Sequence, residues 1–214
     1  MTGLMETLVI PRMKSQRRIR SSFRHIALPR GNAAERFSVV SLFAGCGGMD
    51  LGFKGGFHFL GKHYERNDFD IIWANEINPH ACATYRLNLG DHIVEGDINV
   101  CMDTLPVYAD VVIGGFPCQD ISINGKMLGL AGTRSSLYTV IVKTVSRLRP
   151  KVFVAENVGG LLMKKHEAAL QRILSDFKSL GYNVTYHLYR AKEYGVPQTR
   201  ERVVFVDWGE ITTY

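Results

Sequence analysis

The sequence predicts an α/β fold in which a mostly parallel sheet carries helices on both faces. Short runs of β-branched and apolar residues recur along the chain, and stretches with apolar residues at helical spacing separate them. Glycines or acidic residues directly follow several of these runs, at the strand ends where open α/β sheets bind ligands. The 214 residues, 46% of them hydrophobic, suit one medium domain with a sizeable core.

Predicted strands and helices alternate from Phe37 onward. The predicted strands are residues 37–43, 69–74, 92–94, 109–113, 151–155, 184–188 and 202–206. The predicted helices begin at Met49, at Asn78-Pro79, at Thr133 and before Leu170, and the last of them ends at Gly181. This alternation is typical of a Rossmann-like α/β domain.

The net charge of +6 comes from the N-terminal segment. Residues 1–36 hold eight Lys or Arg against two Glu, whereas residues 37–214 carry no net charge. Such an arm suits contact with nucleic-acid phosphates, although a solvated terminus explains it slightly better. We expect residues 1–36 to form a flexible basic arm and residues 37–214 to form the folded domain.

Other bulk features favour a protein of the cytoplasm. No apolar run approaches the roughly 20 residues that a membrane span needs, and the N-terminus lacks the apolar core of a signal peptide. The seven histidines form no pair with metal-ligand spacing, so we expect no metal. The cysteines show no CxxC pair and no disulfide rhythm, which fits a reducing compartment; they are Cys46, Cys82, Cys101 and Cys118.

The stretch ADVVIGGFPCQDIS, residues 109–122, organises the chain. Its β-branched run predicts a buried strand, Gly114 and Gly115 end it, and Cys118 follows a proline-stiffened turn just past the strand. A cysteine at this edge is placed to act as a nucleophile. The alternative is a small buried apolar side chain, the usual role of a free cysteine.

A glycine loop and two acids suggest a nucleoside-type cofactor. The loop FAGCGG, residues 43–48, follows the first strand but lacks the GxGxxG dinucleotide spacing, and by itself it fits a structural turn equally well. Glu76 ends the second strand, where an acid is placed to accept hydrogen bonds from a ribose. Asp97 ends the third strand, where an acid is placed to receive an adenine amino group. Each acid alone is more typical of a loop or a helix cap, but together with the loop they favour a cofactor.

Seven motifs in order make the chain resemble the cytosine-5 DNA methyltransferases. They lie within residues 38–206 and read SLFAGCGGMDLGF (41–53), NE (75–76), GDI (96–98), GGFPCQDIS (114–122), GTRSSLY (132–138), AENV (155–158) and QTRERV (198–203). The resemblance implies a Rossmann-like methyltransferase fold and S-adenosylmethionine as cofactor. It also implies that Phe43 contacts the adenine, Glu76 the ribose and Asp97 the adenine amino group. The further cofactor-binding residues that it implies are Gly45, Cys46, Gly47, Ile98, Pro117 and Leu137.

The chemistry of cytosine methylation accounts for the implied catalytic residues. Carbon 5 of cytosine becomes nucleophilic once a thiolate adds at carbon 6, and Cys118 is the candidate nucleophile. A protonated or hydrogen-bonded carboxyl at ring nitrogen 3 relieves the developing charge, a role for Glu156. Arg202, together with Arg200, is expected to hold the cytosine carbonyl. The target base must be flipped out of the duplex or single-stranded. For Glu156 the alternative is a structural carboxylate, and for Arg202 a surface cation.

The family pattern is incomplete here. In the family a target-recognition region and a last motif follow the catalytic core, whereas this sequence stops at Tyr214. We therefore expect residues 37–214 to form a catalytic methyltransferase domain that is incomplete at its C-terminus. The chain would then be a truncated form, or the catalytic subunit of a split enzyme whose second chain carries target recognition. In a bacterium the resemblance also implies association with the nucleoid. Protection of DNA in a restriction-modification system is a family-level expectation.

Three other functions remain open from the sequence. An RNA methyltransferase acting on tRNA would share every motif, and a catalytically silent regulatory fragment would bind cofactor without turnover. A nicotinamide enzyme with a thiol is the rival from another class. It explains neither the glycine spacing nor the joint presence of GGFPCQ, ENV and QTRERV.

Overall fold

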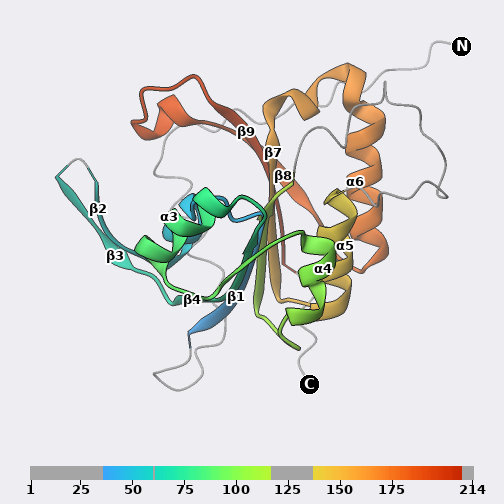
Figure 1. Ribbon diagram of the computed structural model, residues 1–214. Helices are drawn as coiled ribbons and strands as arrows, with labels where there is room; N and C mark the ends of the chain where they lie inside the picture. Colours follow the sequence, from blue (N-terminus) through green and yellow to red (C-terminus); the bar gives the residue numbers. More distant parts are fainter. Residues whose placement is uncertain (1–35, 60, 117–136, 209–214) are drawn as a thin grey trace, which may run out of the picture. The chain divides into compact units, whose positions relative to one another are not determined.

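The computed structural model describes residues 36–59, 61–116 and 137–208, which form a seven-stranded sheet, a two-stranded hairpin and the helices packed on the sheet (Figure 1). The strands are β1 (Phe37–Leu42), β2 (Gly55–Phe59), β3 (Lys62–Arg66), β4 (Phe69–Glu76), β5 (Ile93–Glu95), β6 (Val111–Gly115), β7 (Val152–Val158), β8 (Thr185–Arg190) and β9 (Glu201–Trp208). The α-helices of the described residues are α2 (Gly48–Lys54), α3 (Pro79–Leu89), α4 (Ile98–Cys101), α5 (Leu137–Leu148) and α6 (Glu167–Ser179). Apart from Arg36, the predicted basic arm lies outside the described residues.

The large sheet has the order β5-β4-β1-β6-β7-β9-β8. The pairs from β5 to β7 are parallel, whereas β9 runs antiparallel to both β7 and β8. The prediction of a mostly parallel sheet is therefore confirmed. Because the parallel strands share a direction, the loops after β1, β4, β5, β6 and β7 meet at one edge, called here the carboxyl edge.

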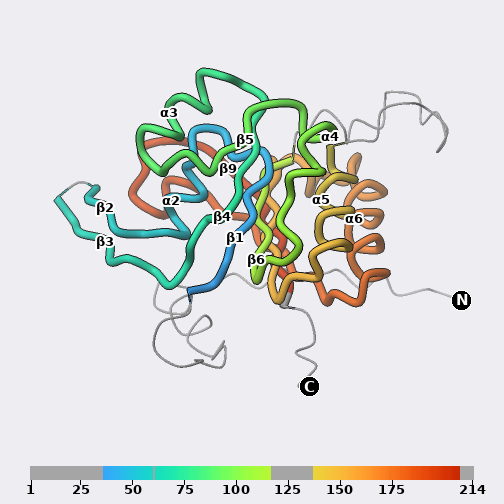
Figure 2. Tube along the Cα trace, turned by 60° about the horizontal axis from the view of Figure 1, so that its bottom comes forward, coloured from blue at the N-terminus to red at the C-terminus, as the bar shows by residue number. Residues whose placement is uncertain are grey.

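Helices cover both faces of the sheet, as predicted (Figure 2). Helices α2 and α3 pack on one face and α4, α5 and α6 on the other. Strands β1 and β6 alternate between the two cores: Val39 and Val111 pack toward α3, whereas Val40 and Val112 pack toward α5. This period-two alternation is what a strand buried on both faces requires.

The helix ends follow the predicted capping chemistry. The side-chain oxygen of Asn78 accepts hydrogen bonds from the backbone of His80 and Ala81, and Pro79 is the first residue of α3. Gly181 follows α6 with φ +87°, the left-handed conformation expected after a helix. The predicted cap at Thr133 lies outside the described residues. In the described part of the chain no helix is long and apolar enough to cross a membrane.

The β2–β3 hairpin is an element that the sequence analysis did not predict. It leaves α2 through Gly55, which has φ +63°, and it returns to β4. The rings of Phe57 and Tyr64 stack across the two strands with centroids 4.9 Å apart. Both strands are largely exposed, so they lack the buried apolar pattern on which the strand predictions relied.

Candidate active site

The glycine loop after β1 is held in a tight conformation by its neighbours. Phe43 and Gly47 have φ of +57° and +86°. The amide of Gly47 donates to the carbonyl of Ala44 (2.9 Å), and the amide of Ala44 donates to Asn75 at the end of β4 (2.9 Å). A side chain at Gly47 would come within 2.1 Å of Leu89 on α3. This position therefore needs glycine both for its conformation and for its space.

Glu76 lies against this loop. Its Oε2 accepts from the amide of Gly45 (2.9 Å), and its Oε1 accepts from the amides of Ile77 (3.0 Å) and Asn78 (2.9 Å). These bonds fix the carboxylate at the carboxyl edge. Because carboxylate oxygens accept more than one hydrogen bond, Glu76 keeps capacity for a ligand hydroxyl.

Asp97 and Ile98 lie at the same edge, after β5. The amide of Gly96 donates to the carbonyl of Glu76 (3.0 Å), which joins the two acid-bearing segments. Asp97 is exposed and caps α4, because its Oδ1 accepts from the amide of Asn99 (2.8 Å). Ile98 is buried in the core beneath it. The predicted cofactor residues Gly45, Gly47, Glu76 and Asp97 are thus brought to one end of the sheet.

A second group of predicted residues gathers around Glu156 on β7. Its Oε1 pairs with Nε of Arg202 (2.5 Å) and lies 3.7 Å from Nη2 of Arg200. Its Oε2 lies over the end of β6, where a side chain at Gly115 would approach it to 3.0 Å. Arg202 lies in β9 and Arg200 lies just before it. Because β9 runs antiparallel to β7, its first residues lie at the carboxyl edge. Glu156 and the two arginines therefore form one cluster beside the end of β6.

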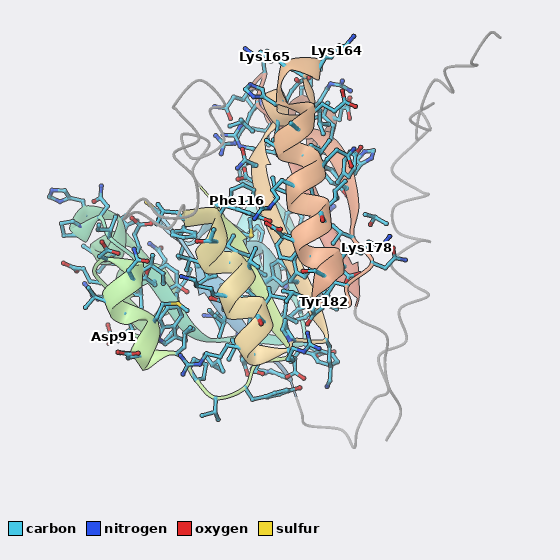
Figure 3. The ribbon with its side chains drawn as sticks, turned by 90° about the vertical axis from the view of Figure 1, so that its right-hand side faces the viewer. Asp91, Phe116, Lys164, Lys165, Lys178 and Tyr182 are labelled. Atoms are coloured by element: carbon cyan, nitrogen blue, oxygen red, sulfur yellow. The ribbon has the colours of Figure 1, made fainter. Side chains whose placement is uncertain are left out.

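The segment after β6 is tied to β7 at Phe116. The side chain of Asn157, which is buried, donates to the carbonyl of Phe116 (2.9 Å). The ring of Phe116 contacts Tyr138 near the start of α5 (Figure 3). Pro117 and Cys118 lie outside the described residues. Leu137 begins α5 and packs partly against the core, and Cys46 is exposed in the glycine loop.

Comparisons with known proteins identify the family of this chain. The family model described as C-5 cytosine-specific DNA methylase matches residues 37–209. The chain belongs to this family.

Relatives of this chain include bacterial type II methyltransferases. It is 44% identical to M.NgoFVII of Neisseria gonorrhoeae over 177 residues and 38% identical to M.BbvI of Brevibacillus brevis over 183 residues. The alignments cover 82% and 80% of the chain but 44% and 49% of those proteins. The chain thus spans about half the length of these relatives. It covers 70% of M.AquIA of Picosynechococcus, to which it is 37% identical.

Solved structures share the fold. An E. coli prophage protein proposed to be a DNA modification methyltransferase is 27% identical, with a TM-score of 0.62 over 81% of this chain and 47% of its own. The Dnmt2 methyltransferase of S. pombe is 22% identical, with a TM-score of 0.59 over 84% of this chain and 51% of its own. The Rossmann-like methyltransferase fold that the motifs implied is therefore confirmed.

Several buried polar residues lie within the recognised motifs, but the sequence analysis assigned no individual role to them. Asn75 donates to the carbonyls of Val94 (2.9 Å) and Gly96 (3.1 Å) and so aligns β5 with β4. Asn157 belongs to a recognised motif, but its bond to Phe116 was not foreseen. Asp50 follows the glycine loop and is fully buried. The sequence signal that could have pointed to Asp50 is an acidic residue beside the apolar positions of a short helix. An acid in such a position becomes buried and then needs hydrogen-bond partners. Among the described residues no group of three or more His, Cys, Asp or Glu is arranged to hold a metal ion.

Proposed function

We propose that this chain transfers a methyl group from S-adenosylmethionine to carbon 5 of a flipped-out cytosine in DNA. Membership of the C-5 cytosine-specific DNA methylase family supports the reaction type. The observation that carries the proposal is the cluster of Glu156 with Arg202 and Arg200 beside the end of β6. This cluster places an acid and two cations next to the strand from which the motif of Cys118 continues.

The cofactor site of this proposal is the glycine loop with the two acids. S-adenosylmethionine supplies an electrophilic methyl group on a sulfonium. Glu76 binds the ribose, Asp97 the adenine amino group, and Phe43 the adenine ring. Gly45, Cys46, Gly47, Ile98, Pro117 and Leu137 complete the pocket by resemblance to the family. The hydrogen bond between Gly45 and Glu76 supports this assignment because it brings the two halves of the pocket into contact.

The proposed catalytic roles involve Cys118, Glu156 and Arg202. The thiolate of Cys118 adds to carbon 6, and carbon 5 then attacks the methyl group, whose bond to the sulfonium sulfur breaks so that S-adenosylhomocysteine leaves. Loss of the carbon 5 proton to a base expels the thiolate and restores the ring. Oε1 of Glu156 is engaged by both arginines, so Oε2 is the oxygen that hydrogen-bonds the ring at nitrogen 3. Arg202 holds the carbonyl at carbon 2 and stabilises the charge that develops on it.

A trapping assay tests this function. The chain is incubated with S-adenosylmethionine and duplex DNA containing 5-fluorocytosine, whose fluorine blocks the final elimination. We expect a denaturation-resistant adduct that is lost in Cys118→Ala and slowed at least about 100-fold in Glu156→Gln, the effect of removing a charge-stabilising group. Cys101→Ala, which changes a buried core thiol, serves as the control and keeps the adduct.

The outcomes of this assay separate the alternatives. An adduct with fluorinated tRNA but not with DNA would replace the DNA substrate by RNA. An adduct that forms only after a second polypeptide is added, such as the product of a downstream gene, would assign target recognition to that partner. Cofactor binding with no adduct on either nucleic acid, with or without a partner, would contradict the proposed activity.

A further inference from the structure

Behind the glycine loop, three side chains from three elements meet in a buried network. Asp50, in the first turn of α2, is fully buried. Its Oδ1 accepts from the hydroxyl of Ser41 on β1 (2.7 Å), and its Oδ2 accepts from the hydroxyl of Tyr85 on α3 (2.6 Å). A carboxyl buried to this degree costs several kcal/mol unless such donors satisfy it. The network therefore holds α2, β1 and α3 in one arrangement.

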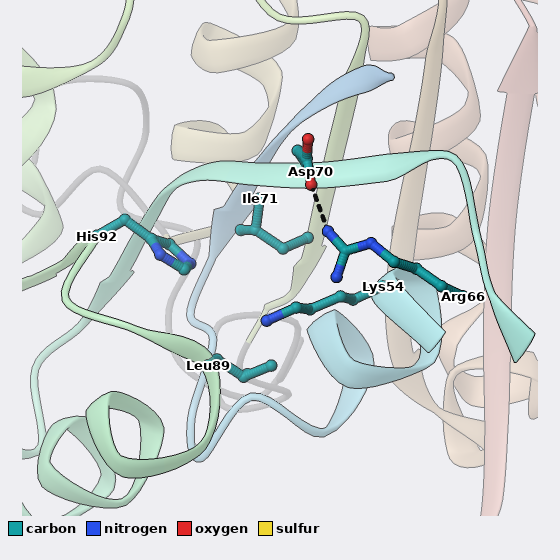
Figure 4. Close-up of a pocket in the computed structure, with 6 residues that line it drawn as sticks. All are labelled: Lys54, Arg66, Asp70, Ile71, Leu89 and His92. Atoms are coloured by element: carbon teal, nitrogen blue, oxygen red, sulfur yellow. Dashed lines mark hydrogen bonds and ion pairs between the residues drawn. The ribbon is translucent and has the colours of Figure 1, made fainter. Parts of the chain in front are cut away.

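His92, in the segment before β5, is the outer end of this network. Its Nε2 lies 2.9 Å from the phenol oxygen of Tyr85. Because Tyr85 gives its proton to Asp50, the Nε2–H of His92 donates to that oxygen. The imidazole also lines a cavity of about 260 Å³ together with Lys54 and Leu89 (Figure 4). The network thus runs from a surface cavity to the end of β1.

The same residues of α3 touch the glycine loop directly. The position that a Cβ of Gly47 would occupy lies 2.9 Å from Cδ2 of Tyr85 and 2.1 Å from Cδ1 of Leu89. The amide of Leu51 donates to the carbonyl of Gly47 (2.8 Å), which joins the loop to the helix that carries Asp50. Gly47 is therefore confined on one side by the ring of Tyr85 and on the other by the start of α2. Displacement of Tyr85 or Asp50 would release the loop.

We propose that Tyr85, Asp50 and His92 are positioning residues that hold the glycine loop, residues 43–48, in the conformation that receives S-adenosylmethionine. This inference rests on the proposed function, because it assigns the loop to the cofactor. The three residues do not touch the cofactor; they act from the opposite side of the loop through hydrogen bonds and packing. Loop geometry in this protein is accordingly set by α3 and by the segment before β5.

The ionisation states of these groups are consistent with a fixed network. Burial raises the pKa of Asp50, while the hydrogen bonds from Tyr85 and Ser41 lower it and leave a net rise. Burial and the neighbouring charge of Asp50 raise the pKa of Tyr85 far above its usual range, so the phenol keeps its proton. Burial, with Lys54 nearby, lowers the pKa of His92 against the opposing effect of Asp91. A neutral imidazole at pH 7 suits its place beside the phenol.

Tyr85→Phe is the sharpest test because it removes the phenol oxygen and keeps the ring that packs against Gly47. Tyr182→Phe is the matched control: Tyr182 is also buried, and its hydroxyl donates to the carbonyl of Pro150 (2.7 Å) on the other face of the sheet (Figure 3). Three quantities are measured in the full chain: the Kd for S-adenosylmethionine, the melting temperature, and hydrogen exchange at the amides of Ala44, Gly45 and Gly47 without cofactor. All three amides are hydrogen-bonded in the structure, so their exchange reports opening of the loop.

We expect Tyr85→Phe to raise the Kd about tenfold, the size of one lost hydrogen bond to a charged group, and to speed exchange of the loop amides. Tyr182→Phe should lower the melting temperature by about as much as Tyr85→Phe lowers it, because each variant loses one buried hydroxyl. It should leave the Kd and the loop exchange unchanged. His92→Gln, which alters the outer end alone, should give a smaller rise in Kd.

Two results would overturn the inference. One is unchanged loop exchange in Tyr85→Phe. The other is an equal change in Tyr182→Phe, because that would reflect general loss of stability. Failure of the wild-type chain to bind S-adenosylmethionine would instead count against the proposed cofactor. The exchange measurement is made without cofactor, so it would still decide whether the network holds the loop.

Discussion

Gly115 is the last residue of β6, and its missing side chain leaves room for the carboxylate of Glu156. An added Cβ would lie 3.0 Å from Oε2, closer than ordinary van der Waals contact. The backbone of Gly115 needs no glycine for its conformation, so the contact with Glu156 is the reason that its size matters. The proposed contact to cytosine thus depends on a few tenths of an ångström at one residue.

Gly115→Ala should lower kcat/KM for methyl transfer about tenfold or more, because Oε2 must move from the position that it occupies now. The Kd for S-adenosylmethionine should stay unchanged, since the glycine loop lies elsewhere along the edge. Gly160→Ala is the matched control, because a Cβ at Gly160 meets nothing within 4 Å. Equal activity of the two variants would show that Glu156 does not act through Oε2.

At the scale of elements, the antiparallel β9 explains how Arg202 reaches Glu156. In the register of β7 with β9, Glu156 faces Val204 and Val158 faces Arg202. Arg202 is therefore a diagonal neighbour of Glu156 on the same face of the sheet, within reach of long side chains. A parallel β9 would carry its first residues to the opposite edge of the sheet. The reversed direction of this strand is thus a requirement of the site.

Asn157 couples two elements, because its side chain ties β7 to the backbone that follows β6. Asn157→Ala leaves the buried carbonyl of Phe116 without this donor, so the free energy of unfolding should fall by about 1–3 kcal/mol. Urea denaturation measures this loss. Asn88→Ala removes an exposed amide that donates to the carbonyl of Thr84 within α3, and it should cost far less. Similar losses of unfolding free energy in both variants would mean that the hydrogen bond from Asn157 to Phe116 contributes little to stability.

The sequence predicts the sheet well because each strand carries its own signal. The β-branched runs around Val40, Ile113 and Val154 become buried strands, and the cap at Asn78 starts a helix. The β2–β3 hairpin lacks such a signal because its residues are exposed. A glycine loop and acids at strand ends indicate the first part of the candidate site, whereas the second part, around Glu156, was expected only from the resemblance to the family. The network of Asp50 with Tyr85 is not predictable in this way, because it joins residues 35 positions apart that meet only when α3 packs on the sheet.

At the scale of the whole molecule, Asp110 joins three strands at the edge opposite the candidate site. Its Oδ2 accepts from the amide (2.9 Å) and hydroxyl (2.8 Å) of Ser38 on β1, and its Oδ1 accepts from Tyr108 (2.7 Å) and Lys151 (2.7 Å). Burial raises the pKa of Asp110, but the hydrogen bonds from Lys151, Tyr108 and Ser38 outweigh it and bring the pKa to about 2. Asp110 thereby fastens β1 and the start of β7 to the segment that enters β6.

This carboxylate should make the fold sensitive to acid. A pKa lowered from 3.8 to about 2 stabilises the folded state above pH 4, and that stabilisation is lost as the pH falls from about 4 to 2. Between pH 5 and pH 2, the difference in unfolding free energy between wild type and Asp110→Asn should shrink by about 2 kcal/mol. Urea denaturation across this range measures it. Asp103→Asn, at an exposed aspartate, is the control. A difference that does not change with pH would contradict the role of Asp110.

The side chains of β1 and β6 point alternately into two separate cores, and this separation affects which substitutions the molecule tolerates over evolutionary time. The sheet separates the side chains around Tyr85 and Leu89 from those around Phe153 and Phe177, so a volume lost on one side cannot be refilled from the other. Substitutions on opposite sides should accumulate almost independently, whereas those within one core constrain each other. The helices behind the glycine loop and the helices α5 and α6 can therefore diverge at different rates while the strands between them stay fixed.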